Sequence, residues 1–410
     1  MPAHALQGLR VLDLSRVLAG PYAAQILADL GADVVKVERP GAGDDTRHWG
    51  PPWSHDPDGK PGDASYYFAA NRNKRSLAVN LKAAGAPALV RRLADWADVV
   101  IENYKPGDLE RYGLDHRTLL ALKPSLIWCS ITGFGHESPN AHRAGYDFMI
   151  QAESGLMDIT GEADGRPLRA GVAVADLTTG MMAATAILAA LRHRDRTGGR
   201  EAGQGQHIDM ALFDVTVGWL ANQATGWLVG GVEPRRMGNQ HPSIVPYQDF
   251  PTATTPIALA VGNDHQFAIL ASLVGEPGWA TDPRFATGAA RAANRDLLVP
   301  MVEAVLRTRP AAEWLALLAE AQVPAGPINR VRDALESPQA EARGLVVEQP
   351  HPRLGTVRTV AQPLALTATP PSYRRPPPAV GEQGREILAG IGLDDAEIEA
   401  LAEAGVVALP

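Results

Sequence analysis

The segment LRVLDLSRVLAGPYAAQILADLGADVVKVE, residues 9–38, carries the strongest fold signal in the chain. Its two ends, LRVLDLS (9–15) and ADVVKVE (32–38), are short apolar runs rich in valine and leucine, which is typical of buried strands. Between them, PYAAQILADLG (21–31) has apolar residues at helical spacing and ends in glycine, which is typical of a helix. The segment therefore predicts a strand–helix–strand unit with parallel strands.

The same alternation continues beyond residue 38. The predicted strands are SLAVNL (76–81), ADVVIEN (97–103) and SLIWCSITG (125–133), with helices around 86–96 and over 108–123. This order predicts an α/β fold with a doubly wound, Rossmann-like, largely parallel sheet. Such sheets bind ligands beyond the carboxyl ends of their strands, where this chain has SRVLAGPY, VERPG and IENYKPG. Neither GxGxxG nor GxxxxGK[ST] is present, so a dinucleotide cradle and a P-loop are not expected.

Turn-rich segments divide the chain. GVEPRRMGNQHPSIVPYQ (231–248) reads as a linker and loop, and the mixed strand and helix patterns after it predict a smaller α+β domain. We expect that domain to cover residues 226–325. The large domain would consist of residues 1–225 and a returning segment, 326–410, which completes it.

Composition limits the classes of function. The chain has 410 residues, a net charge of -8 and a pI near 5.8, which argues against nucleic-acid binding and against a membrane partner. Cys129 is the sole cysteine, so an intrachain disulfide and a cysteine-cluster metal site are excluded, and HExxH is absent; no metal is expected. We see neither a signal-type start nor an uninterrupted 18-residue apolar segment, and expect a cytoplasmic protein.

One acid stands out in GVAVADLTTGMMAATAILAALRHR (171–194), an otherwise small and apolar run. Burying Asp176 costs several kcal/mol unless the carboxylate is paired, hydrogen-bonded or protonated. One interpretation is that Asp176 caps the helix that follows, because an aspartate at a helix start satisfies free N–H groups. The other is that Asp176 is the reactive group of the protein. The residues alone leave both open.

Several segments in order resemble the class III CoA-transferases. They are LQGLRVLDLSRVLAGPYAAQILADLGADVVKVERPGAGDDTR (6–47), NRNKRSLAVNLK (71–82), ADVVIENYKPGDLERYGL (97–114), AGYDFMIQAESG (144–155), VAVADLTTGMMAA (172–184), VPAGPINRVRDALESPQ (323–339) and RPPPAVGEQ (375–383). The resemblance covers nearly the whole chain. It implies a Rossmann-like large domain, a smaller domain, and a homodimer of two interlocked rings.

The resemblance also implies the chemistry. Asp176 matches the family nucleophile, which attacks an acyl-CoA thioester and passes through aspartyl anhydride and aspartyl-CoA thioester intermediates. Tyr146 matches a tyrosine near the thioester. CoA is a substrate, and no cofactor is bound permanently. Arg39, Asn103 and Arg111 match positions that hold the nucleotide and its phosphates, and three further cations in or beside matching motifs are expected to pair with phosphate oxygens: Lys74, Arg75 and Arg143.

This chain departs from some family members at two places. Leu18 stands where some members carry glutamine, and the loop RRMGNQHPSIVPY (235–247) has one glycine where some members have a glycine-rich loop that shields the intermediate. We also expect the small residues near Asp176 to leave free backbone N–H groups for a developing oxyanion.

The segments around HPSIVPYQDF (241–250) resemble the branch that moves CoA from succinyl-CoA to dicarboxylic acids such as glutarate. A second carboxylate needs a cation or hydrogen-bond donors at its far end. The candidate substrate-binding residues are Arg16, Gln240, His241 and Ser243, with Arg235 and Arg236 nearby in the sequence.

Two alternative functions remain open. α-Methylacyl-CoA racemases resemble the chain as well, but they have histidine where this chain has Tyr146, and a tyrosine with a pKa of about 10 is poorly suited to remove a proton near neutral pH. His142 is close in the sequence but not at the matching position. A non-catalytic CoA-binding protein is the alternative from a different class.

Overall fold

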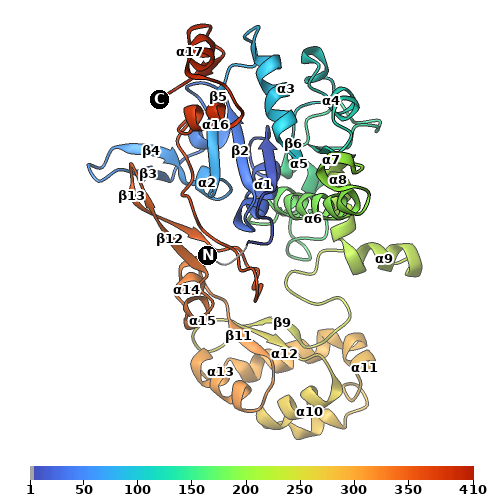
Figure 1. Ribbon diagram of the computed structural model, residues 1–410. Helices are drawn as coiled ribbons and strands as arrows, with labels where there is room; N and C mark the ends of the chain where they lie inside the picture. The colour runs from blue at the N-terminus through green and yellow to red at the C-terminus, as the bar shows by residue number, and fades with distance from the viewer. Residues whose placement is uncertain (1–3) are drawn as a thin grey trace. The chain divides into compact units, whose positions relative to one another are not determined.

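The computed structural model describes residues 4–410, which divide into two compact units. Unit 1 contains residues up to 156, 170–224 and 339–410, and unit 2 contains residues 157–169 and 225–338. Unit 2 therefore includes 157–169 and 326–338 in addition to the smaller domain expected from the sequence. Figure 1 shows the sheet of unit 1 and the helices around it.

Unit 1 is built on a seven-stranded sheet with the order β14-β5-β2-β1-β6-β7-β8. The strands are β1 (Arg10–Asp13), β2 (Asp33–Glu38), β5 (Lys74–Val79), β6 (Val99–Glu102), β7 (Ile127–Thr132), β8 (Gln206–Ala211) and β14 (Val407–Ala408). All neighbours from β5 to β8 pair in parallel, and β14 pairs antiparallel with β5 at the edge. The parallel α/β sheet predicted from the sequence is confirmed.

Helices cover both faces of this sheet. One face packs against α3 (Ala86–Trp96), α4 (His116–Leu122), α16 (Gly384–Gly390) and α17 (Asp395–Glu403), and the other against α1 (Ala19–Asp29), α5 (Asp147–Glu153), α6 (Val174–Arg196) and α8 (Leu212–Trp219). Val11 and Val34 belong to one core and Leu12 and Val35 to the other. Because both faces are buried, the central strands are rich in valine, leucine and isoleucine.

The single helix predicted over residues 108–123 is wrong. The structure has a short 3-10 turn, η2 (Glu110–Tyr112), followed by α4, which starts at His116. Gly113 separates the two with a φ of 61°, a left-handed conformation that ends a helix and suits glycine. Asp115 then begins α4, because its carboxylate accepts a hydrogen bond from the Thr118 backbone N–H.

Helix α6 has Asp176 in its first turn and packs in the core. By length and composition it is the one helix in residues 4–410 apolar enough to cross a membrane, but half of its most apolar window is buried within the protein. It packs along α1, where a Cβ at Gly180 would lie 2.7 Å from the Ala19 carbonyl oxygen. Such contacts are typical of a core helix, so its apolar character is explained by packing.

The remaining elements of unit 1 are short. They are η1 (Asp45–His48), β3 (Trp53–His55), β4 (Pro61–Ala64), α2 (Ser65–Phe68), α7 (Gly199–Ala202), β12 (Val346–His351) and β13 (Gly355–Val360). Strands β3 and β4 form one antiparallel pair, and β12 and β13 form another. The chain passes between the units at four points, and two of them lie in the helices α9 (Ala221–Gly230) and α15 (Pro338–Ala342).

Unit 2 has its own core. Its antiparallel sheet has the order β11-β10-β9, with β9 (Tyr247–Phe250), β10 (Ile257–Ala260) and β11 (Ala325–Pro327). Its helices are α10 (Asp264–Leu273), η3 (Pro277–Ala280), α11 (Gly288–Ala293), α12 (Arg295–Leu306), α13 (Ala311–Glu320) and α14 (Val331–Leu335). Phe250, Phe267 and Trp314 are buried among them.

Candidate active site

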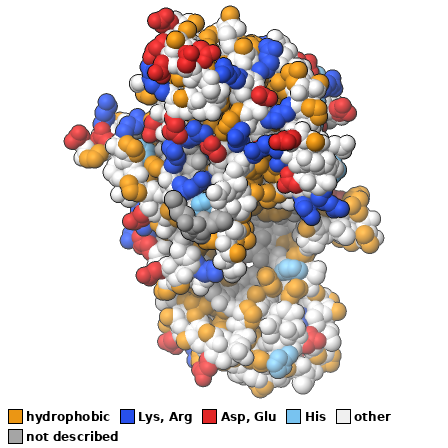
Figure 2. Space-filling model, viewed as in Figure 1, with side chains coloured by type: hydrophobic (Ala, Val, Ile, Leu, Met, Phe, Trp, Pro, Cys, Tyr) orange, Lys and Arg blue, Asp and Glu red, His pale blue; other side chains and the backbone are white. Residues whose placement is uncertain are grey.

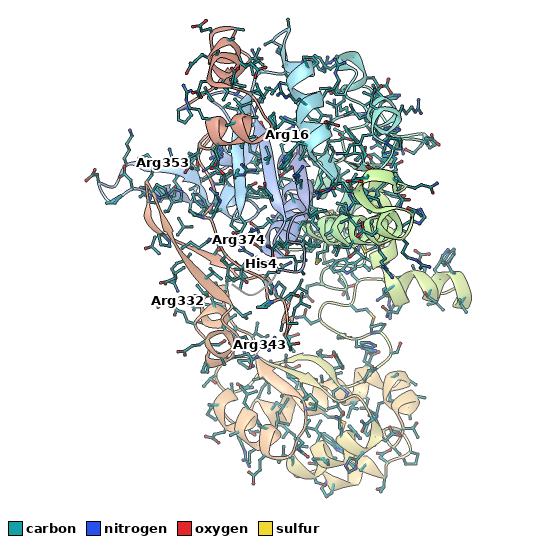
Figure 3. The ribbon with its side chains drawn as sticks, in the orientation of Figure 1. His4, Arg16, Arg332, Arg343, Arg353 and Arg374 are labelled. Atoms are coloured by element: carbon teal, nitrogen blue, oxygen red, sulfur yellow. The ribbon has the colours of Figure 1, made fainter. Side chains whose placement is uncertain are left out.

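The strand order of unit 1 reverses between β1 and β6. The chain places β2 and β5 on one side of β1 and then returns to place β6, β7 and β8 on the other side. In doubly wound sheets this reversal opens a crevice outside the carboxyl ends of the strands. Arg16 follows β1 and Asn103 follows β6, so both lie at this crevice. Figure 3 shows that Arg16 and Arg374 lie near opposite ends of the sheet.

Two pockets of unit 1 meet at this crevice. One has a volume of about 780 Å³ and is lined by residues that follow β1, β2 and β5. The other, of about 460 Å³, is lined by residues that follow β1, β6 and β7 and by Asp176. We call them the larger pocket and the acid pocket. Arg16, Tyr104 and Asp108 line both pockets.

The larger pocket contains several cations. Arg39 and Arg111, both predicted from the sequence, line it together with Lys82. Sequence reasoning missed Lys82, although it follows a predicted strand directly and therefore stands at the carboxyl edge where ligands bind. On the face shown in Figure 2, basic and acidic side chains of unit 1 are interspersed. The cations of the larger pocket suit a phosphorylated ligand.

The acid pocket brings together five of the predicted residues. They are Asp176, Tyr146, Arg143, Asn103 and Arg16. Tyr146 is 63% exposed. Its loop crosses the end of β7 at a glycine pair, since a Cβ on Gly145 would lie 2.2 Å from the Gly133 Cα. Both positions therefore require glycine, and this close crossing sets where Tyr146 stands.

The N-terminus of α6 is capped by a neighbouring helix. The Asp147 carboxylate, in the first turn of α5, accepts hydrogen bonds from the backbone N–H groups of Ala175 at 2.8 Å and Asp176 at 3.3 Å. Gln151 donates to the other Asp147 oxygen at 2.7 Å. The interpretation of Asp176 as a helix cap is therefore wrong, because its side chain makes no capping bond and the N-cap is Ala173.

The same contacts correct a second expectation. The N–H groups of Ala175 and Asp176 already donate to Asp147, so they are not free to bind a developing oxyanion. Asp147 itself lies in the first turn of α5, and its carboxylate accepts hydrogen bonds from the start of α6.

Burial and the nearby charge of Asp147 raise the pKa of Asp176 from 3.8 to about 7. Burial is the larger cause, because removing a carboxylate from water disfavours its charged form. A carboxyl group with such a pKa changes protonation near neutral pH, which is common for reactive groups. Burial, with smaller contributions from the nearby charges of Asp176 and Asp147, raises the pKa of Tyr66 to about 12, and this residue was not predicted from the sequence. Its hydroxyl therefore keeps its proton.

Arg143 and Asn103 are already engaged in unit 1. Both terminal nitrogens of Arg143 donate to Glu153, at 2.9 and 2.5 Å, and its guanidinium lies 4.8 Å from the Phe134 ring centroid. The Asn103 amide exchanges two hydrogen bonds with the backbone of Arg16. Both side chains line the acid pocket in these positions.

Lys74 and Arg75 do not line either pocket. Lys74 is fully buried, and its ammonium group donates to Asp13, Asn71 and the Pro21 carbonyl. All three of its protons are used, so the predicted phosphate contact of Lys74 is not available in this structure. Burial, the largest effect, lowers the pKa of Lys74 to about 8.

Arg75 lies at the start of β5, the opposite end of that strand from the larger pocket. Its guanidinium pairs with Asp33 and Glu386, and the residue lines a separate pocket of about 660 Å³. The predicted phosphate contact of Arg75 is therefore not supported either. Adjacent residues in a strand point to opposite faces, which the NRNKRS motif does not reveal.

The other predicted substrate residues belong to unit 2. Arg295 donates to the Gln240 amide oxygen at 3.1 Å, and His241 Nδ1 accepts from the backbone of Ser243 at 3.0 Å and of Ile244 at 3.1 Å. These contacts order the loop within unit 2. Gly238, the single glycine of this loop, has a φ of 59°.

Among residues 4–410, neither a cysteine nor a histidine lines the acid pocket. Burial raises the pKa of the Cys129 thiol well above its usual range, so it is not a ready nucleophile. Within residues 4–410, no group of three or more histidine, cysteine, aspartate or glutamate side chains is arranged to hold a metal ion. The site thus combines one carboxyl group of near-neutral pKa with an adjoining cationic pocket. This arrangement suits acyl transfer from a phosphorylated carrier to a carboxylate.

Comparison with known proteins supports this chemistry. Residues 6–384 match the family model of CoA-transferase family III. A succinate–glutarate CoA-transferase of Agrobacterium fabrum is 48% identical over 384 residues, which cover 94% of this chain and 95% of that protein. A succinyl-CoA:glutarate CoA-transferase of Mus musculus is 42% identical over 403 residues, covering 98% of this chain and 90% of the relative.

A solved structure of a related protein is similar to this chain in both fold and sequence. The CAIB/BAIF family protein from Brucella suis has a TM-score of 0.84 and 47% sequence identity, covering 95% of this chain and 99% of that chain. The fold and site define an α/β enzyme that acts on CoA thioesters. The chain belongs to CoA-transferase family III and is a CoA-transferase.

Proposed function

We propose that the protein transfers CoA from succinyl-CoA to a dicarboxylic acid such as glutarate, with Asp176 as the nucleophile. The observation that carries the proposal is the position of Asp176 in the acid pocket, which shares lining residues with the cationic larger pocket. The nucleotide end of CoA would occupy the larger pocket, with its phosphates near Arg39, Lys82 and Arg111. The thioester would then reach Asp176. The names of the relatives from Agrobacterium fabrum and Mus musculus support the choice of substrates.

The proposed reaction begins with ionised Asp176. Its carboxylate attacks the thioester carbonyl, which forms an acyl-aspartyl anhydride and releases the CoA thiolate. The thiolate attacks the aspartyl carbonyl, forms the aspartyl-CoA thioester and releases the donor acid. The acceptor carboxylate next attacks this thioester and forms a second anhydride with release of the thiolate. Attack of the thiolate on the acceptor carbonyl yields the new acyl-CoA and restores Asp176.

Two groups are suited to these steps: Asp176, which lines the acid pocket, and Tyr66, which lies near Asp176. Because its pKa is about 7, Asp176 is more basic than an exposed carboxylate and is still largely ionised in mildly alkaline solution. The Tyr66 hydroxyl keeps its proton and is therefore available as a hydrogen-bond donor. Because an anhydride hydrolyses in water, the occupied pocket must exclude solvent during turnover.

Trapping the intermediate tests the nucleophile. Incubation with succinyl-CoA followed by hydroxylamine or borohydride should modify the peptide that contains residues 171–180. Asp176→Ala should lose turnover by orders of magnitude and still bind CoA. Asp195→Asn, at the exposed end of the same helix, is the matched control and should keep normal turnover. Near-normal turnover of Asp176→Ala would refute the assignment.

A second experiment separates transfer from racemisation. In deuterated water, a racemase exchanges the α-proton of a 2-methylacyl-CoA without an acceptor acid, and a transferase does not. No histidine lines the acid pocket in the described part of the chain, which leaves a racemase without the expected base. Exchange at a rate comparable to turnover would overturn the proposal. A non-catalytic CoA-binding protein would bind CoA and show neither transfer nor exchange.

We also propose that the protein is a homodimer, as its family resemblance implies. A very large interface would make the folded monomer unstable. Light scattering at micromolar concentration should then give about twice the chain mass of 43.6 kDa. A folded monomer under these conditions would contradict the proposal.

A further inference from the structure

Arg16 is the cation at the junction of the two pockets. It lines the larger pocket and the acid pocket, whereas Arg39 and Arg111 line only the first and Arg143 only the second. A group at this junction is near both the CoA thioester and the acid that exchanges with it, if the proposed function is right.

The backbone of Arg16 is held on both sides. Its N–H donates to Asn103 Oδ1 at 3.0 Å, and its carbonyl accepts from Asn103 Nδ2 at 2.7 Å. The next residue, Val17, has a φ of 72°, which is strained for a β-branched side chain, and its N–H donates to Asp44 at 3.2 Å. Strain that the surroundings maintain is common at functional sites. The Arg16 backbone is therefore fixed across the switch point between β1 and β6.

Asp45 holds the side chain of Arg16. Its Oδ2 accepts a hydrogen bond from Arg16 Nη1 at 2.9 Å, and its Oδ1 accepts one from Arg39 Nη2 at 2.6 Å. One carboxylate is thus shared by two guanidinium groups, and the three side chains keep a net charge of +1. The Arg16 side chain is 51% exposed, and Nη1 is its only nitrogen with a hydrogen-bond partner in residues 4–410. The remaining N–H groups of the guanidinium can donate hydrogen bonds to an anion.

The other cations of the acid pocket are less suitable. Arg143 is neutralised by two bonds to Glu153. Lys105 is exposed and lies in the loop after β6, and its ammonium group has no ion-pair partner in the described residues. A lysine there is a mobile point charge, whereas an anchored arginine binds a carboxylate with two parallel hydrogen bonds.

We propose that Arg16 binds the distal carboxylate of the dicarboxylic acid and that Asp45 is the positioning residue that holds the Arg16 side chain in place. This inference rests on the proposed function and specifies which side chains set its preference for diacids. One carboxylate of the acid reacts at Asp176. The distal carboxylate accepts hydrogen bonds from the guanidinium N–H groups of Arg16 that Asp45 does not bind. Asp45 keeps Arg16 at the junction and partly neutralises it, so that the acid can leave after reaction.

The test compares glutarate with pentanoate, which has the same chain length and lacks the second carboxylate. Succinyl-CoA is the donor for both, so the donor half-reaction cancels in the ratio of their kcat/KM values. Arg16→Met should lower this ratio about 10- to 100-fold, the loss expected for a charged hydrogen bond. Asp45→Asn should raise the KM for glutarate with a smaller change in kcat, and Asp45→Glu should recover part of the ratio.

Two variants serve as controls. Lys105→Met removes a cation of the same pocket that has no ion-pair partner in residues 4–410, and it should keep the selectivity ratio. Arg39→Met releases the other partner of Asp45 and should raise the KM for succinyl-CoA equally with both acids. The inference is overturned if Arg16→Met keeps the ratio, if Lys105→Met loses it, or if Asp45→Asn lowers kcat equally for both acids. Wild-type protein that transfers CoA to neither acid would instead refute the proposed function.

Discussion

Replacing Asp176 with asparagine should stabilise the folded protein in alkaline solution. Asparagine has nearly the same shape and cannot ionise, so Asp176→Asn removes the cost of a charge in this pocket. The pKa of Asp176 is about 7 in the fold and 3.8 for an ordinary aspartate, and this difference corresponds to about 4 kcal/mol at 1.36 kcal/mol per pKa unit. The pocket is open to water, which screens part of this cost, and we expect about 2 kcal/mol.

The direction of the pH dependence follows from proton binding. Between pH 4 and pH 7 the folded wild type holds a proton on Asp176 that the unfolded chain has lost. Because the folded state binds more protons, the contribution of this group to stability falls as pH rises through that range. Below pH 4 both states are protonated, and the variant has no electrostatic advantage. The variant should therefore gain on the wild type as pH rises, and the gain should level off above pH 7.

Urea unfolding at pH 5, 6, 7 and 8 measures this difference in the free energy of unfolding. Other titrating groups are the same in both proteins, so their effects cancel in the difference. Asp195→Asn, on the same helix but exposed, is the control for replacing an aspartate of α6 with asparagine. If the stability difference between Asp176→Asn and the wild type is flat, or if it falls with rising pH, the reasoning about burial is refuted.

Three further predictions concern the neighbouring groups. Asp147→Asn removes the charge that helps to raise the pKa of Asp176, so the midpoint of the pH–rate profile for succinyl-CoA should move to lower pH; an upward shift would contradict this. Lys82→Met should raise the KM for succinyl-CoA about tenfold without changing the KM for the acceptor, and equal effects on both would place Lys82 elsewhere. Arg72→Met leaves the buried carboxylate of Asp29 without its bidentate partner and should cost about 3–5 kcal/mol by thermal unfolding, whereas a loss below 1 kcal/mol would show a weak pair.

The sheet was predictable because its signal is local. Buried parallel strands are rich in valine, leucine and isoleucine, and the strands β1, β2, β5, β6 and β7 could each be recognised without knowing their neighbours. The crevice could also be anticipated, since the segments after the strands contain Arg16, Arg39 and Asn103. The break before α4 was missed because one glycine inside a helical pattern does not by itself show that its φ is positive.

The errors at the site have a different cause. Lys74 resembles a surface cation beside turn residues, but in the fold it pairs with Asp13, 61 positions earlier in the chain. The N–H groups of Ala175 and Asp176 were expected to be free, but they donate to the Asp147 carboxylate, 28 and 29 residues earlier in the chain. No local pattern reveals such partners, because they are set by the packing of distant segments. Residue type therefore indicated which groups ionise, but not which of them face the pocket.

The capping of α6 explains why a carboxyl group can remain available at its first turn. The N-terminus of a helix favours a negative charge and has unpaired N–H groups, and an aspartate there usually folds back to bind them. In this protein Asp147 binds two of those groups from α5, so Asp176 does not need to. Burial is the larger cause of the raised pKa of Asp176, and the negative charge of Asp147 raises it further. One side chain thus stabilises the helix start and makes the neighbouring acid more basic, and a cap from a separate helix is needed for both effects.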